Sequence, residues 1–285
     1  MSDAGYWVDI HRSGKRLGAG FLLTACYVLT ADHCLGSAAL DAEKVEVEFE
    51  SGEVLPGRVY RRAPAADLAL IDVITSGRGP VIPRADRAGV GDRWRNPYRP
   101  SISHAFLSGT VDAAPVWYQC EGGDSVEAMQ LGCVQDLGDY AGYSGSPVEG
   151  GESDTEGKIF GVLIEQYPVH YPDNSGSRPA SRVLFAAMLS EVFRRFDCFD
   201  VGHLINLLPS SSAGDTSASC GVGRRPSTDG SQRNDADSGI AVADAKLKAL
   251  DAWQKRGLLD EQLITALKWR VVEHHLLDDD AGDQS

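Results

Sequence analysis

The sequence predicts an all-β domain, a barrel or a sandwich, followed by a flexible linker and a small helical hairpin. Short runs rich in Val, Ile, Tyr and Phe recur from residue 6 to about residue 200, and Gly, Pro, Asp and Asn separate them. Long helical patterns do not alternate with these runs, which disfavours a parallel α/β sheet. The first 207 residues are therefore expected to form one β-rich domain, 1–207.

The expected strands follow one another along this domain as short apolar runs between turn residues. They lie at residues 6–10, 20–24, 27–31, 44–49, 68–74, 116–120 and 158–167. Near the end of the domain, the segment LFAAMLSEVFRRF at residues 184–196 predicts a helix.

A change of composition marks the end of the β domain. Residues 209–239 carry almost no large apolar side chains, so they cannot bury enough surface to offset the entropy lost on ordering. We therefore expect a flexible linker over residues 208–241. The last residues, 278–285, read DDDAGDQS and are expected to be a solvated acidic tail.

Apolar residues at helical spacing return after the linker. Leu247, Leu250 and Trp253 form one such set, and a second set follows from Leu263 to Val271. Gly257 suits the end of the first helix, and Asp260 suits the start of the second because its carboxylate can accept from free amides. The pattern predicts a helical hairpin over residues 242–277.

Composition and charge exclude several classes of function. The net charge is −14 and the pI is about 4.9, so a polyanion such as nucleic acid would be repelled and no nucleic-acid partner is expected. The first residues carry charges where a signal peptide needs an apolar stretch. No run approaches the roughly 20 apolar residues of a membrane span. We expect a cytoplasmic protein without a membrane partner.

The cysteines do not indicate a metal centre. The six cysteines are scattered, none belongs to a CxxC pair, and no Cys/His group has zinc-ligand spacing. We expect mostly free thiols in a reducing compartment and no metal or cofactor.

Three separated segments carry candidate catalytic residues. Ser144 lies in GYSGSP, where glycines and proline predict a tight turn. A serine hydroxyl needs a base to remove its proton, commonly a histidine that a buried carboxylate orients. His33 ends the apolar run YVLTADH, and Asp67 opens the apolar run DLALIDV. The chain order His, Asp, Ser is one of the orders known for such a triad.

These segments resemble those of trypsin-like (chymotrypsin-fold) serine peptidases. The matching stretches are GAGFLLTACYVLTADHC, ADLALIDV and GYSGSPV, and the resemblance covers roughly residues 5–207. It implies two six-stranded antiparallel Greek-key β-barrels with the triad in the cleft between them. It further implies Ser144 as the nucleophile, His33 as the base and Asp67 as the residue that orients the base. The oxyanion hole would consist of the backbone amides of Gly142 and Ser144.

The chain departs from the family pattern at two points. Tyr143 stands where the family has an acidic residue that pairs with a new amino terminus after zymogen cleavage, so we expect the oxyanion loop to form without proteolytic activation. The family's disulfide to the cysteine after the histidine is also absent, because Cys26 lies at the wrong spacing to pair with Cys34.

The resemblance also suggests where the substrate binds. The segment QDLGDYA would form the floor of the primary pocket, and Gly138 and Asp139 are the candidates there. An acidic floor would select Arg or Lys. The wall would be the strand FGVLIEQ, with Ile164, Glu165 and Gln166 near the substrate backbone.

Other interpretations of these residues stay open. Ser144 alone could be a turn serine, His33 a core histidine, and Asp67 a strand-edge carboxylate. The G-x-S-x-G elbow of α/β-hydrolases is a near match, but Ser146 occupies the last glycine's place and Pro147 prevents the helix that must follow. A protease-fold module that binds a peptide without turnover, and a protease that is latent until a partner engages the hairpin, remain alternatives.

The C-terminal segment LKALDAWQKRGLLDEQLITALKWRVVE resembles the short C-terminal helical (SHOCT-like) modules of bacterial proteins. So small a hairpin buries little apolar surface by itself. We therefore expect Trp253, Leu263, Leu267 and Trp269 to pack on a second copy, on the protease domain or on an adaptor protein. The combination implies an intracellular serine endopeptidase in bacterial signalling or defence.

Overall fold

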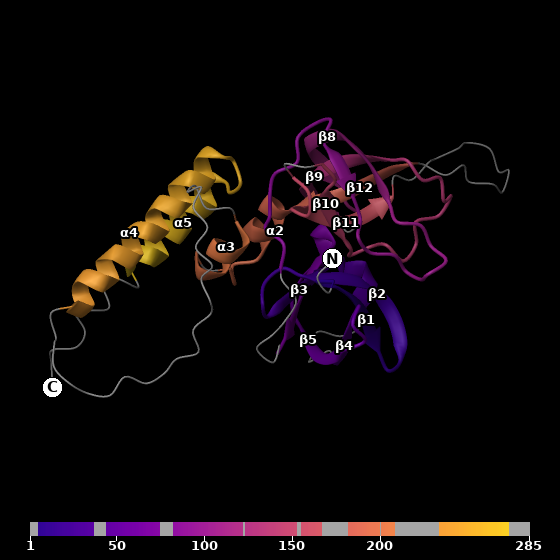
Figure 1. Ribbon diagram of the computed structural model, residues 1–285, viewed down its shortest axis with the longest axis horizontal. Coiled ribbons are helices and arrows are strands. Elements are labelled where there is room, and N and C mark those ends of the chain that lie inside the picture. Colours follow the sequence, from indigo (N-terminus) through magenta and orange to yellow (C-terminus); the bar gives the residue numbers. More distant parts are fainter. Residues whose placement is uncertain are drawn as a thin grey trace. The chain divides into compact units, whose positions relative to one another are not determined.

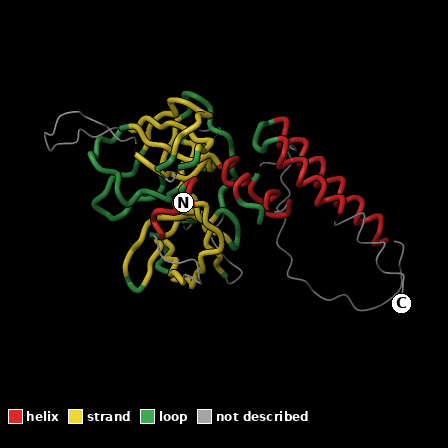
Figure 2. Tube along the Cα trace, turned by 180° about the vertical axis from the view of Figure 1, so that it is seen from behind, coloured by secondary structure: helices red, strands yellow, loops and turns green. Residues whose placement is uncertain are grey.

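The computed structural model describes residues 5–36, 44–74, 82–121, 123–152, 155–166, 182–199, 201–208 and 234–273. The chain divides into two compact units, Met1–Cys198 and Phe199–Ser285. The first unit contains the strands and the second contains three of the helices, as Figures 1 and 2 show.

The first unit begins with a closed six-stranded antiparallel barrel. Its strands are β1 (Trp7–Arg12), β2 (Lys15–Leu22), β3 (Tyr27–Thr30), β4 (Lys44–Phe49), β5 (Val54–Ala63) and β6 (Leu68–Val73). The order β1-β2-β3-β6-β5-β4 places β3 beside β6, with β4 and β5 returning to close on β1. Two short helices, α1 (Asp32–Leu35) and η1 (Pro64–Ala66), lie directly after β3 and directly before β6.

A second closed six-stranded antiparallel barrel follows. Its strands are β7 (Arg93–Arg95), β8 (Ser108–Gln119), β9 (Ser125–Cys133), β10 (Pro147–Gly150), β11 (Ile159–Gln166) and β12 (Val183–Met188). They are ordered β10-β11-β12-β9-β8-β7. The prediction of two antiparallel β-barrels is therefore confirmed, and the α/β-hydrolase alternative is excluded because that fold needs a parallel sheet with helices.

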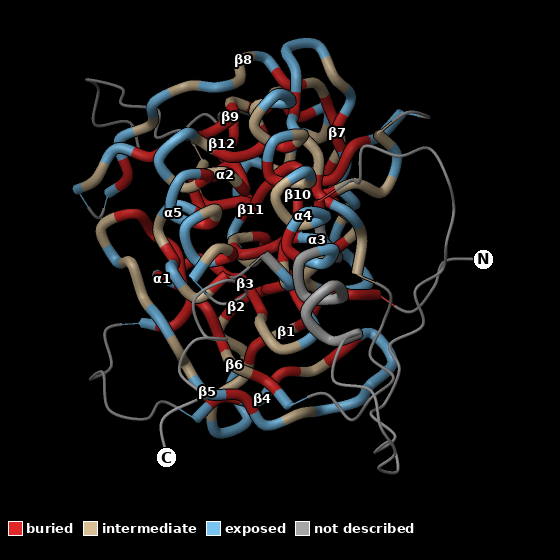
Figure 3. Tube along the Cα trace, turned by 90° about the vertical axis from the view of Figure 1, so that its left-hand side faces the viewer, coloured by how far each residue is buried: buried red, intermediate tan, exposed pale blue. Residues whose placement is uncertain are grey.

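Each barrel has its own apolar core, which Figure 3 shows as buried positions along the strands. In β4, Val45, Val47 and Phe49 are buried and alternate with more exposed residues, as one inward face of a barrel strand requires. The core of the second barrel includes Ala19 from β2 of the first barrel. Side chains of the two barrels thus share one apolar cluster, which brings the loops of both barrels together.

The predicted helix over residues 184–196 is wrong in its first half. Val183–Met188 form strand β12, which pairs with β9 and β11, and only Leu189–Arg195 are helical, as α2. Helix and strand patterns are hard to distinguish in a continuous apolar run. Here the buried position between two strands decides for the extended conformation.

The second unit consists of α3 (Val201–Leu207), α4 (Asn234–Lys255) and α5 (Glu261–Val272). Helix α4 packs along α5, and Lys268 forms an ion pair with Asp251 at 2.6 Å. Asp260 caps α5 by accepting from the Leu263 amide at 2.8 Å, and Gly257 follows α4 in the left-handed conformation (φ +65°). Both helix ends lie where the sequence predicts them.

The unit boundaries differ from the predicted domain boundaries. Helix α3, which the sequence assigned to the β domain, belongs to the second unit. Helix α4 begins at Asn234, so residues 234–241 of the predicted linker are helical and extend the first helix of the hairpin. The rest of the linker, 209–233, and the acidic tail lie outside the described residues.

Two of the four apolar residues expected to pack on a partner are buried. Trp253 and Leu267 are each 1% exposed, and Leu263 is half-buried. Trp269 is 63% exposed and is the large apolar residue that α5 presents to solvent.

Five cysteines in the described part of the chain are free thiols, namely Cys26, Cys34, Cys120, Cys133 and Cys198. No helix within the described ranges has both the length and the apolar character needed to cross a membrane.

Candidate active site

His33 lies in α1, the single helical turn that follows β3. The preceding residue, Asp32, accepts two hydrogen bonds from Arg62 of β5, at 2.6 Å from Nε and 3.0 Å from Nη2. The Arg62 guanidinium also donates to the carbonyl of Gly36 at 2.7 Å, just beyond the turn. Because both side chains of this ion pair are at least nine-tenths buried, the bidentate contact holds the turn that carries His33 against the barrel.

Asp67 connects η1 to β6 in the left-handed conformation, with φ 52° and ψ 41°. Such a conformation costs a non-glycine residue on the order of 1–3 kcal/mol, and aspartate tolerates it better than most. This conformation places Asp67 next to α1, where its carbonyl accepts a hydrogen bond from the Asp32 amide at 3.1 Å. Strain at this position therefore serves to aim the carboxylate.

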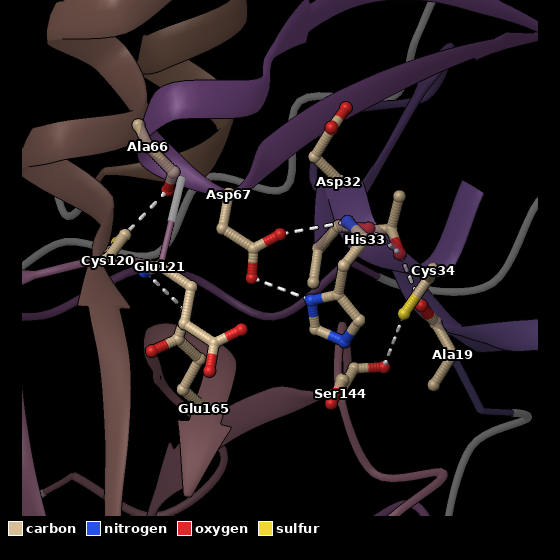
Figure 4. A network of polar contacts seen from close by, with 12 residues as sticks. Ala19, Asp32, His33, Cys34, Ala66, Asp67, Cys120, Glu121, Ser144 and Glu165 are labelled. Atoms are coloured by element: carbon tan, nitrogen blue, oxygen red, sulfur yellow. Dashed lines mark hydrogen bonds and ion pairs between the residues drawn. The ribbon is translucent and has the colours of Figure 1, made fainter. Parts of the chain in front are cut away.

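The carboxylate of Asp67 makes two contacts with His33, drawn in Figure 4. Oδ1 accepts from the His33 backbone amide, and Oδ2 accepts from the imidazole Nδ1, both at 2.8 Å. A proton on Nδ1 leaves Nε2 of a neutral ring free to accept another proton. The contact therefore selects the tautomer that a general base requires.

The environment of His33 stabilises the charged imidazolium. The Asp67 side chain is 7% exposed and the His33 side chain is 50% exposed. The Asp67 carboxylate, which accepts a hydrogen bond from the ring, is the largest cause that raises the pKa of His33 from 6.5 to about 10; neighbouring Cys34 adds to this rise, and partial burial opposes it. The pair thus stabilises the cation that forms when the ring takes a proton.

Ser144 lies in the turn between β9 and β10 and is anchored on both sides. Its carbonyl accepts from the Ala19 amide at 3.3 Å and from the Cys34 thiol at 3.5 Å, both in the first barrel. The next amide, that of Gly145, donates to the Leu163 carbonyl of β11 at 2.8 Å. The Ser144 carbonyl and the Gly145 amide belong to one peptide group, so this group is held by the first barrel on one side and by the second barrel on the other, which fixes where the serine side chain begins.

Gly145 is required by the close approach of the first barrel. Its φ is +85°, and a Cβ there would lie 2.1 Å from the Ala19 carbonyl oxygen and 2.6 Å from Thr30 Oγ1. Neither the conformation nor the space admits a side chain.

Gly142 has a positive φ of +89°, a backbone conformation that glycine adopts without strain. Within the described ranges, the amide N–H groups of Gly142 and Ser144 donate to no protein acceptor. Unused donors on both sides of Tyr143 are what an oxyanion hole needs, because the acceptor is supplied only during the reaction.

The predicted site residues converge on one cleft of the first unit. His33, Asp67, Gly142 and Ser144 all line it. Figure 4 shows Ser144 beside the His33 ring, away from the edge that Asp67 contacts. The predicted pocket residues Asp139, Ile164, Glu165 and Gln166 also line the cleft. Gly138 is not among the lining residues, although its carbonyl accepts from Gln166 Nε2 at 3.5 Å.

Sequence reasoning missed an acidic contributor to this cleft. Glu121 lines it beside Glu165, and its backbone amide donates to Glu165 Oε1 at 3.2 Å. The other oxygen of Glu165 accepts from the Tyr118 hydroxyl at 2.5 Å, and burial together with this contact raises the pKa of Tyr118. No local motif marks Glu121, because it follows β8 and meets Glu165 of β11, 44 residues further along the chain, only in the folded protein.

The cleft offers no metal centre in the described part of the chain, where no three His, Cys, Asp or Glu side chains are grouped to hold an ion. The chemistry available there is that of a hydroxyl, an imidazole, a carboxylate and backbone amides.

Comparison with known proteins identifies the family. The model of the trypsin-like peptidase domain matches residues 18–162, just over half of the 285 residues. The match runs from β2 to β11 and includes His33, Asp67 and Ser144. No curated protein matches the chain. With two closed antiparallel barrels and this match, the chain belongs to the trypsin-like peptidase domain family.

Proposed function

We propose that the protein is a serine endopeptidase that cleaves peptide bonds with the triad Ser144, His33 and Asp67. The observation that carries the proposal is the 2.8 Å contact between His33 Nδ1 and Asp67 Oδ2 in a cleft that Ser144 also lines. A buried carboxylate, an oriented imidazole and a serine on a tight turn are the parts of a nucleophile activated by an adjacent base.

The proposed reaction begins when Ser144 Oγ attacks the scissile carbonyl carbon. His33 Nε2 takes the hydroxyl proton and then gives a proton to the leaving amine, so that an acyl-enzyme remains. Asp67 keeps the imidazole in the reactive tautomer and stabilises its positive form. A water molecule, activated by the same imidazole, then hydrolyses the ester and restores the serine.

The backbone amides of Gly142 and Ser144 are proposed to bind the oxyanion of the tetrahedral intermediate. Losing one such donor typically costs about 10²–10³ in kcat. Ile164, Glu165 and Gln166 of β11 are proposed to lie along the substrate backbone, and Asp139 beside the side chain that enters the pocket.

The alternatives are a peptide-binding module without turnover and a latent protease. The first would retain the cleft and bind a peptide without forming a covalent intermediate. The second would require a partner to bind the second unit, Phe199–Ser285, called the helical unit below, before the serine reacts.

Reaction with a fluorophosphonate probe separates the enzyme from the binding module. In the full-length protein, Ser144 Oγ should displace fluoride and bond to phosphorus, so that about one probe is incorporated per chain. Ser144→Ala should abolish labelling. Ser51→Ala is the matched control, because Ser51 is exposed in the turn between β4 and β5 and should leave labelling unchanged. An unlabelled, freshly folded wild-type protein would support the binding module.

We also propose that the enzyme is cytoplasmic and that the helical unit mediates oligomerisation or adaptor binding in signalling or defence. The resemblance of the hairpin to SHOCT-like modules and the 63% exposure of Trp269 support this role. Large exposed aromatic side chains are frequent anchors of protein interfaces.

Replacing Trp269 by serine should therefore weaken self-association. We expect light scattering to give a mass above the 30.6 kDa of one chain for the wild type, and a mass close to one chain for Trp269→Ser. Gln262→Ala, at an exposed position of the same helix, is the control. A wild type that stays monomeric at all accessible concentrations would argue against self-association through this unit.

A further inference from the structure

An arginine of the first barrel holds the loop that precedes the proposed nucleophile. Arg16 of β2 donates from Nη2 to the carbonyl oxygen of Gly142 at 3.0 Å. The contact joins residues 126 positions apart in the sequence and links the first barrel to the turn between β9 and β10. A hydrogen bond from a charged guanidinium is about twice as strong as one between neutral groups.

The guanidinium is itself oriented by two further residues. Its Nε donates to Asp9 Oδ1 of β1 at 2.6 Å, and its Nη2 also contacts the Tyr98 hydroxyl. That hydroxyl donates to the same Asp9 oxygen at 2.7 Å, which closes a triangle of side chains. Arg16 and Asp9 are 30% and 27% exposed, so the network is largely shielded from solvent.

Tyr98 connects this network to the core. It is fully buried, and its ring meets the rings of Trp7 and Tyr143 edge to face, with centroid distances of 5.3 and 6.5 Å. Tyr143, the residue between Gly142 and Ser144, is also fully buried and donates from its hydroxyl to the Ala105 carbonyl at 2.6 Å. The loop is thus anchored by an aromatic side chain at the position where the family has a carboxylate.

The backbone hydrogen bonds around Ser144 show why the contact of Arg16 with the Gly142 carbonyl is important for the two amides. The Ser144 amide belongs to a peptide group whose carbonyl, that of Tyr143, accepts from the Ser146 amide at 3.1 Å. Because a trans peptide points its N–H and C=O in opposite directions, this contact directs the Ser144 N–H. The Gly142 amide has no equivalent support: within the described ranges, neither it nor the Ala141 carbonyl has a hydrogen-bond partner.

The orientation of the Gly142 amide therefore depends on the groups on either side. The Ala141 amide donates to Asp139 Oδ1 at 2.8 Å, which holds the preceding peptide group. The following peptide group is held by Arg16 at the Gly142 carbonyl and by the Tyr143 amide, which donates to the Tyr140 carbonyl at 3.2 Å. Glycine imposes little conformational preference of its own, so removing Arg16 loosens the ψ angle of Gly142 and leaves the Tyr143 amide as the one remaining hydrogen bond on this peptide group among the described residues.

We infer that Arg16, oriented by Asp9 and Tyr98, is the positioning residue that keeps the Gly142 amide ready to donate to the oxyanion. The inference rests on the proposed function. It assigns to a side chain of the first barrel the support that the family draws from a carboxylate next to the nucleophile. The oxyanion hole then forms on folding, with no cleavage of the chain.

The test compares Arg16→Met, Arg16→Lys and Tyr98→Phe in the full-length protein. For Arg16→Met we expect kcat/KM per labelled active site to fall about 10- to 100-fold, chiefly through kcat, because the oxyanion exists only after attack. Affinity for a peptide aldehyde, whose adduct with Ser144 carries the oxyanion, should fall by a similar factor while KM changes little. Arg16→Lys should recover part of the loss, and Tyr98→Phe should show a smaller loss of the same kind.

Arg58→Met is the matched control, because Arg58 is 61% exposed in the same barrel and its contact with Asp72 is long, at 3.7 Å. Equal kcat/KM and aldehyde affinity in Arg16→Met and Arg58→Met would overturn the inference, as would a loss confined to KM or to the fraction of sites that can be labelled. A wild type that is neither labelled nor active would overturn the proposed function as well. A labelled wild type with an unaffected Arg16→Met variant would overturn the inference alone.

Discussion

Replacing Ser144 by alanine is expected to lower kcat about 10⁶-fold, and adding His33→Ala to this variant should lower it almost no further. Triad members act as a unit, so the loss of the nucleophile already removes what the base contributes. The residual rate would come from substrate binding and the two backbone donors, which do not depend on either side chain. The measurement is turnover, in single and double variants, of a peptide selected from a library that the wild type cleaves.

A non-catalytic histidine supplies the control for this comparison. His11 lies in β1 with its Nε2 3.3 Å from Glu48 Oε2 and does not line the cleft, so His11→Ala should retain wild-type turnover. Additive losses in the Ser144/His33 double variant would show that the two residues act independently and would contradict a triad.

Asp67→Asn is expected to lower kcat about 10⁴-fold with little change in KM. An asparagine can occupy the same position but can present its amide nitrogen to His33, which would favour the tautomer with the proton on Nε2. That tautomer cannot accept the proton of Ser144. The contact that now positions the base would then hold it in the unreactive form.

The pH profile should change in a defined direction in the same variant. Attack requires a neutral imidazole, so kcat/KM of the wild type should rise as the pH passes the raised pKa of His33, above 6.5. Asp67 is the largest cause of that rise, and its loss should move the ascending limb toward lower pH. An ascending limb at the same pH in both proteins would show that Asp67 does not control the titration of His33.

The contact between His33 and Asp67 should also make the stability of the folded protein depend on pH, in the direction that a raised histidine pKa requires. Because the pKa of His33 in the folded protein, about 10, is above the ordinary value of 6.5, the pair stabilises the folded state in full below about pH 6.5. This contribution is lost as the pH rises toward 10. Denaturant unfolding of wild type and Asp67→Asn should therefore differ most in mildly acidic solution and least near pH 10.

Local sequence patterns predicted many of the strands and the candidate catalytic residues. The runs at 6–10, 27–31, 44–49 and 68–74 correspond to β1, β3, β4 and β6, since alternating or continuous apolar side chains suit a strand on a barrel. Strand β5 was missed because Pro56, Gly57 and several arginines interrupt its apolar pattern. Its partners β4 and β6, which lie on both sides of it, supply the hydrogen bonds that hold it extended.

By itself, the sequence determined the class of the fold, the identity of the three candidate catalytic residues and the capped helices of the hairpin. These features depend on side chains close together in the chain, where turn residues, apolar periodicity and caps act locally. Only the tertiary structure decided that Val183–Met188 are a strand, that Glu121 enters the cleft and that Arg16 reaches Gly142. Each of these features depends on contacts between residues that are far apart in the chain and meet only in the folded barrels. No local sequence pattern indicates which distant residues will meet.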